Sequence, residues 1–248
     1  GNNMPVRCGR WKNASNKLQT KKINIKEVSP QQIEIEVTSE IEEVNSEYFT
    51  KYTILGNSEI IVSSRIITHD STLSELPRFG MSMILPKSFD KIAWFGRGPH
   101  ESYQDRKTGA PIGLYEGNVW EQYFPYVRPQ ENGNKTDVRW LSLTDNEGVG
   151  ILICGMPLIS TSAHQFSMSE LDHPGKHNPQ RHRNDIKPGE IISLNIDYKQ
   201  MGVGGDNSWG ARTHPEYTLP AGEYSYSFRI RPFSKKESKE TVLSKMVY

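Results

Sequence analysis

The sequence lacks the features that mark several classes of protein. Its 248 residues contain no apolar run long enough to cross a membrane as a helix, which argues against a transmembrane protein. Lys and Arg number 30 against 29 Asp and Glu, so the formal charge of +1 gives no reason to expect nucleic acid as a partner. The first residues show neither the basic nor the apolar region of a signal peptide. We therefore expect a soluble protein, and the sequence leaves its compartment, cytoplasmic or periplasmic, open.

Cysteine and metal-binding motifs are also scarce. The two cysteines, Cys8 and Cys154, are too few for a disulfide scaffold, and Cys154 lies in an apolar run where a buried thiol is expected. Neither a Cys pair nor a His-Glu-x-x-His helix supports zinc. We therefore predict no metal site and interpret the polar loop 172–185 as solvated or as an inter-domain contact, leaving open the roles of its histidines, His173, His177 and His182.

What the sequence does contain is typical of many short strands. Hydrophobic residues make up only 35%, whereas aromatic residues reach 10% and Gly and Pro number 20 and 15. Apolar and polar residues alternate in 32–37, 192–198 and 224–230, the pattern of half-buried strands. Further strands are predicted at 22–28, 48–55, 59–68, 79–85, 89–95, 137–144 and 149–154, and helix-like stretches only at 167–171 and 236–246. The sequence predicts an all-β antiparallel sandwich forming one domain, 1–248.

Two segments depart from this pattern and suggest functional loops. The stretch 96–133 mixes Gly, Pro, aromatic and charged residues without period, over a length unusual for a hairpin. In 201–210, glycines precede Trp209, whose flat ring suits the apolar face of a sugar, with Asp206 and Asn207 available to its hydroxyl groups. The alternative is that Trp209 simply packs beneath a loop, since Trp is mostly buried in proteins.

Three ordered segments resemble signatures of a known family. They read WFGRGPHESYQDR at 94–106, YVRPQENG at 126–133 and MGVGGDNSW at 201–209. In this order they resemble the C-terminal domain, or small chain, of glycoside hydrolase family two β-galactosidases, and 219–226 resembles its last strand. The resemblance implies a β-supersandwich similar to galactose mutarotases, placed fifth and last in the parent chain. Trp11 resembles a point well inside that domain, so its first strands are expected to be missing here.

The resemblance also implies a division of labour. The parent hydrolyses terminal β-D-galactosides with two glutamates of a central barrel domain that this chain does not contain, so we expect no catalytic residue here and no activity of the chain alone. Trp209 matches the family tryptophan at the rim of the galactose site. The implied partners are the galactoside and the other domains of the parent, which can form oligomers. The parent family uses Mg and Na ions, mostly bound elsewhere, and none is expected in this chain.

The carboxylates Glu101 and Glu131 are the local candidates for catalysis. A retaining glycosidase needs two carboxylates about 5–5.5 Å apart. Both glutamates lie in Gly- and Pro-rich motifs, so we interpret them as positioning loops through backbone amides or the arginines Arg97, Arg106 and Arg128.

Two other functions remain open for these residues. Glu101 and His164 are the natural acid and base of an aldose 1-epimerase, with His100 beside Glu101 in the same motif. The other alternative is a stand-alone carbohydrate-binding module.

Overall fold

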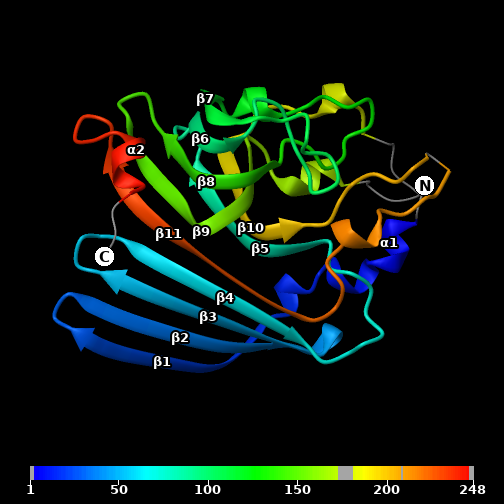
Figure 1. Cartoon of the computed structure of the whole chain (residues 1–248), viewed down its shortest axis with the longest axis horizontal. Coiled ribbons are helices and arrows are strands. Elements are labelled where there is room, and N and C mark those ends of the chain that lie inside the picture. The colour runs from blue at the N-terminus through cyan, green and yellow to red at the C-terminus, as the bar shows by residue number, and fades with distance from the viewer. Residues whose placement is uncertain (1–2, 173–180, 208, 246–248) are drawn as a thin grey trace.

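The computed structural model describes residues 3–172, 181–207 and 209–245 and is built almost entirely from strands (Figure 1). The strands are β1 Gln19–Ser29, β2 Gln32–Ile41, β3 Ser46–Leu55, β4 Ile60–Thr68, β5 Arg78–Pro86, β6 Lys91–Arg97, β7 Ile112–Asn118, β8 Lys135–Thr144, β9 Val149–His164, β10 Ile191–Gln200 and β11 Glu223–Ser234. The helices are short, namely α1 Met4–Arg7, α2 Glu240–Leu243 and 3₁₀ helices at Gly9–Trp11, Ser15–Lys17, Glu42–Val44, Trp120–Gln122, Met168–Leu171, Arg183–Asp185 and Pro215–Tyr217. In the described residues, no helix is long and apolar enough to cross a membrane.

The strands are joined into one antiparallel sheet that doubles back on itself. Its main order is β1-β2-β3-β4-β11-β9-β8-β6-β7, and β10 pairs with both β9 and β5. The long strand β9 makes this possible, because its first half pairs with β11 and its last residues pair with β10. In Figure 1, β1 to β4 lie in a lower group and β5 to β10 above them, with β11 between.

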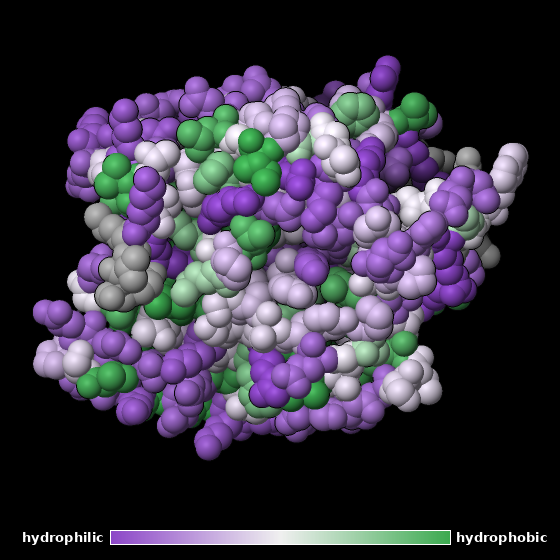
Figure 2. Space-filling view, in the orientation of Figure 1, coloured by the Kyte–Doolittle hydropathy of each residue, from purple (hydrophilic) through white to green (hydrophobic). Residues whose placement is uncertain are grey.

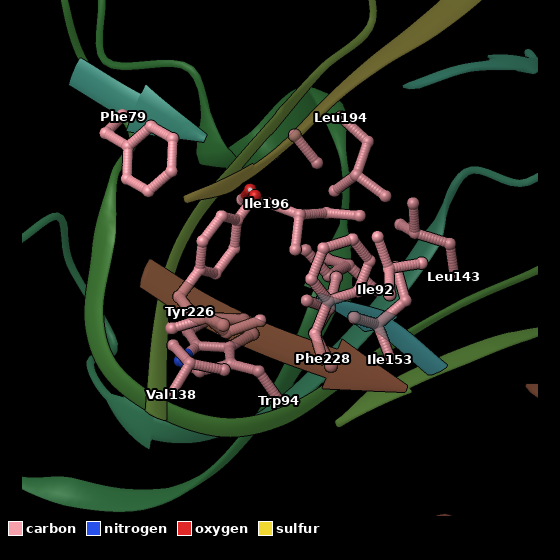
Figure 3. Packing of buried hydrophobic residues seen from close by; sticks show 14 of the residues in the cluster. Phe79, Ile92, Trp94, Val138, Leu143, Ile153, Leu194, Ile196, Tyr226 and Phe228 are labelled. Carbon is pink, nitrogen blue, oxygen red and sulfur yellow. Dashed lines mark hydrogen bonds between the residues drawn. The ribbon is translucent and has the colours of Figure 1, made fainter. Parts of the chain in front are cut away.

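The core lies where these two groups face each other. From β11, Tyr226 and Phe228 point toward Leu194 and Ile196 of β10, as Figure 3 shows, and the Tyr226 hydroxyl donates to the Ile196 carbonyl at 2.8 Å. The Tyr226 ring also meets Phe79 of β5 edge-on, with centroids 5.3 Å apart. Burial of such side chains contributes about 1.5–3 kcal/mol each. One apolar core therefore holds β4 and β11 against β5 and β10.

The all-β prediction is confirmed, and each of the predicted strands forms. Two strand segments were missed. The edge strand β7 contains two glycines, and its apolar residues Ile112 and Leu114 lie on the exposed side, so its sequence does not predict a buried strand face. Near the end of β9, the consecutive small polar residues Ser160, Thr161 and Ser162 are all buried, so this segment gives no apolar alternation. The expected stretch 236–246 is helical only at Glu240–Leu243 among its described residues, and both cysteines are buried and free.

Candidate functional site

The loops that carry the first two sequence motifs meet at Glu101. Its side chain is only 8% exposed and accepts hydrogen bonds from Arg106 Nη2 at 2.5 Å, from the Gly133 amide at 2.8 Å and from the Tyr126 hydroxyl. Arg106 also lies over the Tyr103 ring, 5.3 Å from its centroid. These are the two kinds of partner, an arginine and a backbone amide, that the sequence suggested. They fasten the 94–106 segment to the 126–133 segment.

The second glutamate, Glu131, has different surroundings. It accepts from the Tyr103 hydroxyl at 3.3 Å, and desolvation raises its pKa although Arg78 acts in the opposite direction. Desolvation also raises the pKa of the nearby buried Asp197, to about 7, with the Arg78 guanidinium 3.6 Å away. The structure thus gives Glu101 and Glu131 separate sets of partners.

The expected arginine partners are only partly right. Arg97 pairs with Asp137, Nε to Oδ2 at 2.5 Å, and donates to two loop carbonyls. Arg128 is exposed, and among the described residues no hydrogen bond joins its side chain to either glutamate. Of the three arginines, Arg106 alone binds Glu101. The prediction for Arg97 is wrong because Asp137, at a positive φ of 53°, presents its carboxylate directly to the guanidinium.

A buried lysine and histidine lie on the other side of Gly133. Lys135 is 3% exposed, and its Nζ donates to the Gly133 carbonyl at 3.3 Å and lies 5.2 Å from the Trp94 ring centroid. Burial lowers its pKa to about 8. His164 is fully buried, its Nε2 lies 3.2 Å from Asn132 Oδ1, and burial, then the Lys135 charge, lower its pKa to about 4. Asn132 lies in the 126–133 motif but was not identified as a site residue, and Lys135 lies in no pattern that predicts burial.

The loop that carries Trp209 is anchored by Asp105 of the first motif. The Gly204 amide donates to Asp105 Oδ2 at 2.8 Å, and the Gly202 amide donates to the Tyr217 carbonyl at 2.7 Å. A Cβ on Gly202 would lie 2.6 Å from Thr213 Cγ2 and 2.7 Å from Asp105 Cγ, so only glycine fits there. The third motif is therefore fixed to the first.

Trp209 itself projects from this loop. It is 92% exposed, which does not agree with the alternative that it packs beneath the loop. Asn207 Oδ1 accepts from the Trp209 amide at 2.9 Å and from the Ala211 amide at 3.4 Å, so Asn207 shapes the turn. Asp206 is exposed and accepts from His214 Nε2 at 2.9 Å, which raises the His214 pKa. The turn presents the indole ring and the Asp206 carboxylate on one short segment.

Two other histidines of the sequence analysis, His100 and His182, lie apart from this cluster. His100 is exposed, and His182 precedes the short helix Arg183–Asp185, where its amide donates to Asp185 Oδ2 at 2.7 Å. His173 and His177 lie outside the described residues. Within the described part of the chain, no three His, Cys, Asp or Glu side chains are grouped so that they could hold a metal.

Comparison with known proteins shows the family. The model of the family "Beta galactosidase small chain" matches residues 2–230. A β-galactosidase of Priestia megaterium is 39% identical over 235 residues, covering 94% of this chain and 22% of that protein. A β-galactosidase of Vibrio cholerae is 36% identical over 182 residues, covering 73% of this chain and 16% of that protein. The chain thus spans about a fifth of the length of these relatives.

Solved structures similar to the chain are more distant. The galactosidase domain of an α-galactosidase–sucrose kinase is 12% identical with a TM-score of 0.46, covering 88% of this chain and 28% of that one. A galactose 1-epimerase from Lactobacillus acidophilus is 7% identical with a TM-score of 0.41, covering 88% of this chain and 66% of that one. On the match to the family model and the sequence identity to the curated relatives, the chain belongs to the β-galactosidase small-chain family.

Proposed function

We propose that this chain is the C-terminal domain of a β-galactosidase that hydrolyses terminal β-D-galactosides. In this proposal Trp209 contacts the galactosyl unit, with Asp206 and Asn207 beside it, and the domain packs against other domains of the parent. The catalytic carboxylates lie outside this chain. The galactoside and the other parent domains are its partners, and the Mg and Na ions of the parent bind mostly outside it.

The observation that carries the proposal is the presentation of Trp209. An indole ring is large and apolar, so a side chain that is 92% exposed leaves an unusual amount of apolar surface in water. The loop behind it is held by Asp105 and by the close contact at Gly202, and Asn207 fixes the turn. A loop held by such contacts that presents a flat ring suits stacking on the apolar face of a sugar, because these contacts restrict the loop before binding.

The placement of the glutamates supports the second half of the proposal. Both Glu101 oxygens accept hydrogen bonds from loop groups, and Arg106 neutralises its charge. Glu131 is held by Tyr103 instead. A nucleophile and an acid/base must face one substrate from a short separation. Carboxylates occupied in this way are suited to holding loops.

Two measurements test the proposal. The chain alone should not hydrolyse a nitrophenyl β-galactoside, and robust turnover would contradict the assignment of chemistry to other domains. In the parent enzyme, Trp209→Ala should raise KM about two- to tenfold, because an aromatic contact contributes about 0.5–1.5 kcal/mol. Trp209→Phe is the matched control, since it keeps a ring and should recover most of the affinity. If the kinetics of Trp209→Ala are unchanged, the proposed contact between Trp209 and the sugar is wrong.

The epimerase alternative has one observation in its favour. Glu101 and His164 lie on two sides of Gly133, whose amide binds Glu101 and whose Cβ position is 3.0 Å from His164 Nε2. Against it, His164 is fully buried and therefore out of reach of a sugar, and its pKa of about 4 keeps the ring neutral at pH 7. Polarimetry of freshly dissolved α-galactose with the chain is the test, and accelerated mutarotation would favour the epimerase.

The other alternative is a binding module that acts without a parent enzyme. Calorimetric titration of the chain with galactose separates it from the proposal. A module of this kind would bind galactose by itself in the millimolar range, whereas a domain that supplies one wall of a shared site should bind more weakly.

A further inference from the structure

The strands β1 and β2 carry an apolar face that no second layer covers. Its members are Ile23 and Ile25 of β1 and Ile33, Ile35 and Val37 of β2, and we call it the uncovered face. Ile23 is 60% exposed, Ile25 67% and Ile33 41%, whereas Ile35 and Val37 are half-buried. In Figure 2, green apolar atoms lie among purple ones in the lower part of the molecule, where Figure 1 places β1 to β4.

The register of the sheet makes this face a continuation of the core. Residues paired across antiparallel strands point to the same side of the sheet. One such row runs from Phe228 through Val62, Tyr52 and Ile35 to Ile25. Phe228 and Val62 are each 2% exposed, Tyr52 is half-buried, and Ile25 at the end of the row is 67% exposed. The second layer thus stops part of the way along a row that stays apolar.

The opposite face of the same strands is ordinary protein surface. Its side chains are mostly charged or polar, and Glu34 there pairs with Lys51 at 2.9 Å while Asn24 approaches Glu36 at 3.5 Å. A strand pair in water on both sides would not need to keep apolar residues on one side only. This separation of apolar from charged residues indicates that another part of a protein packs on the uncovered face.

The edge of β1 is protected differently from its face. Among the described strands β1 pairs with β2 alone, so its outer backbone groups are open. Lys21, Lys22 and Lys26 lie along this strand, and lysines on an edge discourage the addition of another strand. On the uncovered face, by contrast, the one charged residue opposite its members is Glu27, which pairs with Ile33, and no lysine of this group lies beside Ile23 and Ile25 on that side. A partner is therefore expected to lie on the face and not to extend the sheet.

We infer that the uncovered face is the docking surface for another part of the same β-galactosidase polypeptide, which lays an apolar layer over β1 and β2. The inference rests on the proposal that this chain is one domain of such a protein. The relatives extend far beyond the matched region, since the chain covers 22% and 16% of two of them. A tethered partner also has a high effective concentration, so a modest apolar face suffices to hold it.

The experiment measures the accessibility of a cysteine placed on the face. Ile25→Cys is compared with Lys26→Cys, its exposed neighbour on the charged face, by maleimide labelling of the peptide that contains both positions. Each variant is made in the 248-residue chain and in the complete parent polypeptide. Cys8 and Cys154 are buried and free, and the unsubstituted proteins give the background. If Ile25→Cys lowers the yield of folded protein, Ile23→Cys replaces it.

The expected result is that both cysteines label at similar rates in the chain alone, whereas in the parent the Ile25→Cys site labels about tenfold or more slower than the Lys26→Cys site. Equal labelling in the parent would overturn the inference. Protection in the chain alone that grows with concentration, with a dimer mass in light scattering, would also overturn it by showing a second copy as the occupant. Because labelling is read without activity, normal kinetics of Trp209→Ala would remove the sugar contact and leave this inference standing.

Discussion

The loop cluster around Glu101 and the strand pair β1–β2 handle burial in opposite ways. In the cluster, charged and polar groups are withdrawn from water, and loop amides, Arg106 and Tyr126 give Glu101 its partners within the chain. In β1–β2 the side chains alternate regularly, yet Ile23, Ile25 and Ile33 remain exposed to water. The cluster is irregular in local sequence but self-sufficient in its contacts. The strand pair is regular in local sequence but lacks a layer.

Removal of the Glu101 carboxylate should test the self-sufficiency of the cluster most severely. Glu101→Ala leaves the Gly133 amide and the Tyr126 hydroxyl without their acceptor and Arg106 without its counter-charge. Loss of one partner of a buried pair costs about 3–5 kcal/mol, and we expect the low end because Arg106 is half exposed. Urea unfolding measures the loss. Glu36→Ala on the charged face of β2 is the control, with an expected change of about 0.5 kcal/mol or less. Equal losses would remove the distinction between the regions.

The two regions also differ in how far sequence reasoning reaches. Local alternation was sufficient to predict β2, because Ile33, Ile35 and Val37 alternate with polar residues, a pattern that indicates a strand whether or not a second layer covers it. It failed for β7 and for the end of β9, where burial does not follow side-chain polarity. Lone residues such as Lys135 carry no local signal at all. In these cases the outcome depends on neighbours that local sequence does not contain.

The candidate site shows the same division. The sequence motifs identified the loops of the candidate site and one pair that the structure contains, Glu101 with Arg106. The bond between Asp105 and Gly204 joins residues 99 positions apart, and no spacing rule connects them. The pairing of Arg97 with Asp137 was also missed, because the two residues are 40 positions apart in the sequence. Sequence patterns find the segments of such a site, and only the fold decides which side chains meet.

The pH dependence of stability should separate the cluster from the strand pair next. His164 has a folded pKa of about 4 against an ordinary value of 6.5, so the unfolded state binds more protons between these values. Stability from neutral His164 is therefore present above pH 6.5 and lost as pH falls toward 4, by up to about 3 kcal/mol. In His164→Gln this contribution is absent, so the difference in the free energy of unfolding between wild type and the variant should shrink as pH falls from 6.5 toward 4.

Asp197 provides a control of opposite sign. Its folded pKa of about 7 lies above its ordinary 3.8, so the folded state binds more protons between these values and stability falls as pH rises through the window. Denaturant unfolding of wild type, His164→Gln and Asp197→Asn between pH 4 and 7 measures both differences. Differences that change in the same direction with pH would contradict the assigned protonation states.

The close contact at Gly202 should have a smaller but clear effect. Gly202→Ala places a methyl group 2.6 Å from Thr213 Cγ2 and 2.7 Å from Asp105 Cγ, so the loop must move. Such overpacking costs about 1–3 kcal/mol, seen as a lower melting temperature, and in the parent it should raise KM because the Trp209 loop shifts. Gly109→Ala is the matched control, since no atom lies within 4 Å of its Cβ position. Similar effects of the two changes would show that the loop tolerates movement.

The smallest change in the free energy of unfolding is expected on the uncovered face, and a small value there would show that the face is not packed in the chain alone. Ile25 and Val62 lie in the same row of the sheet, but Val62 is 2% exposed and Ile25 67%. In the chain alone, Val62→Ala should cost about 2 kcal/mol through the cavity it leaves, whereas Ile25→Ala should change the free energy of unfolding by about 0.5 kcal/mol or less. Urea unfolding of both variants gives the comparison. A large loss from Ile25→Ala in the monomeric chain would mean that this residue already packs against the rest of the domain, and the strand pair would then need no further layer. A small loss in the chain together with a larger loss in the parent would instead show that the row is completed by residues beyond it.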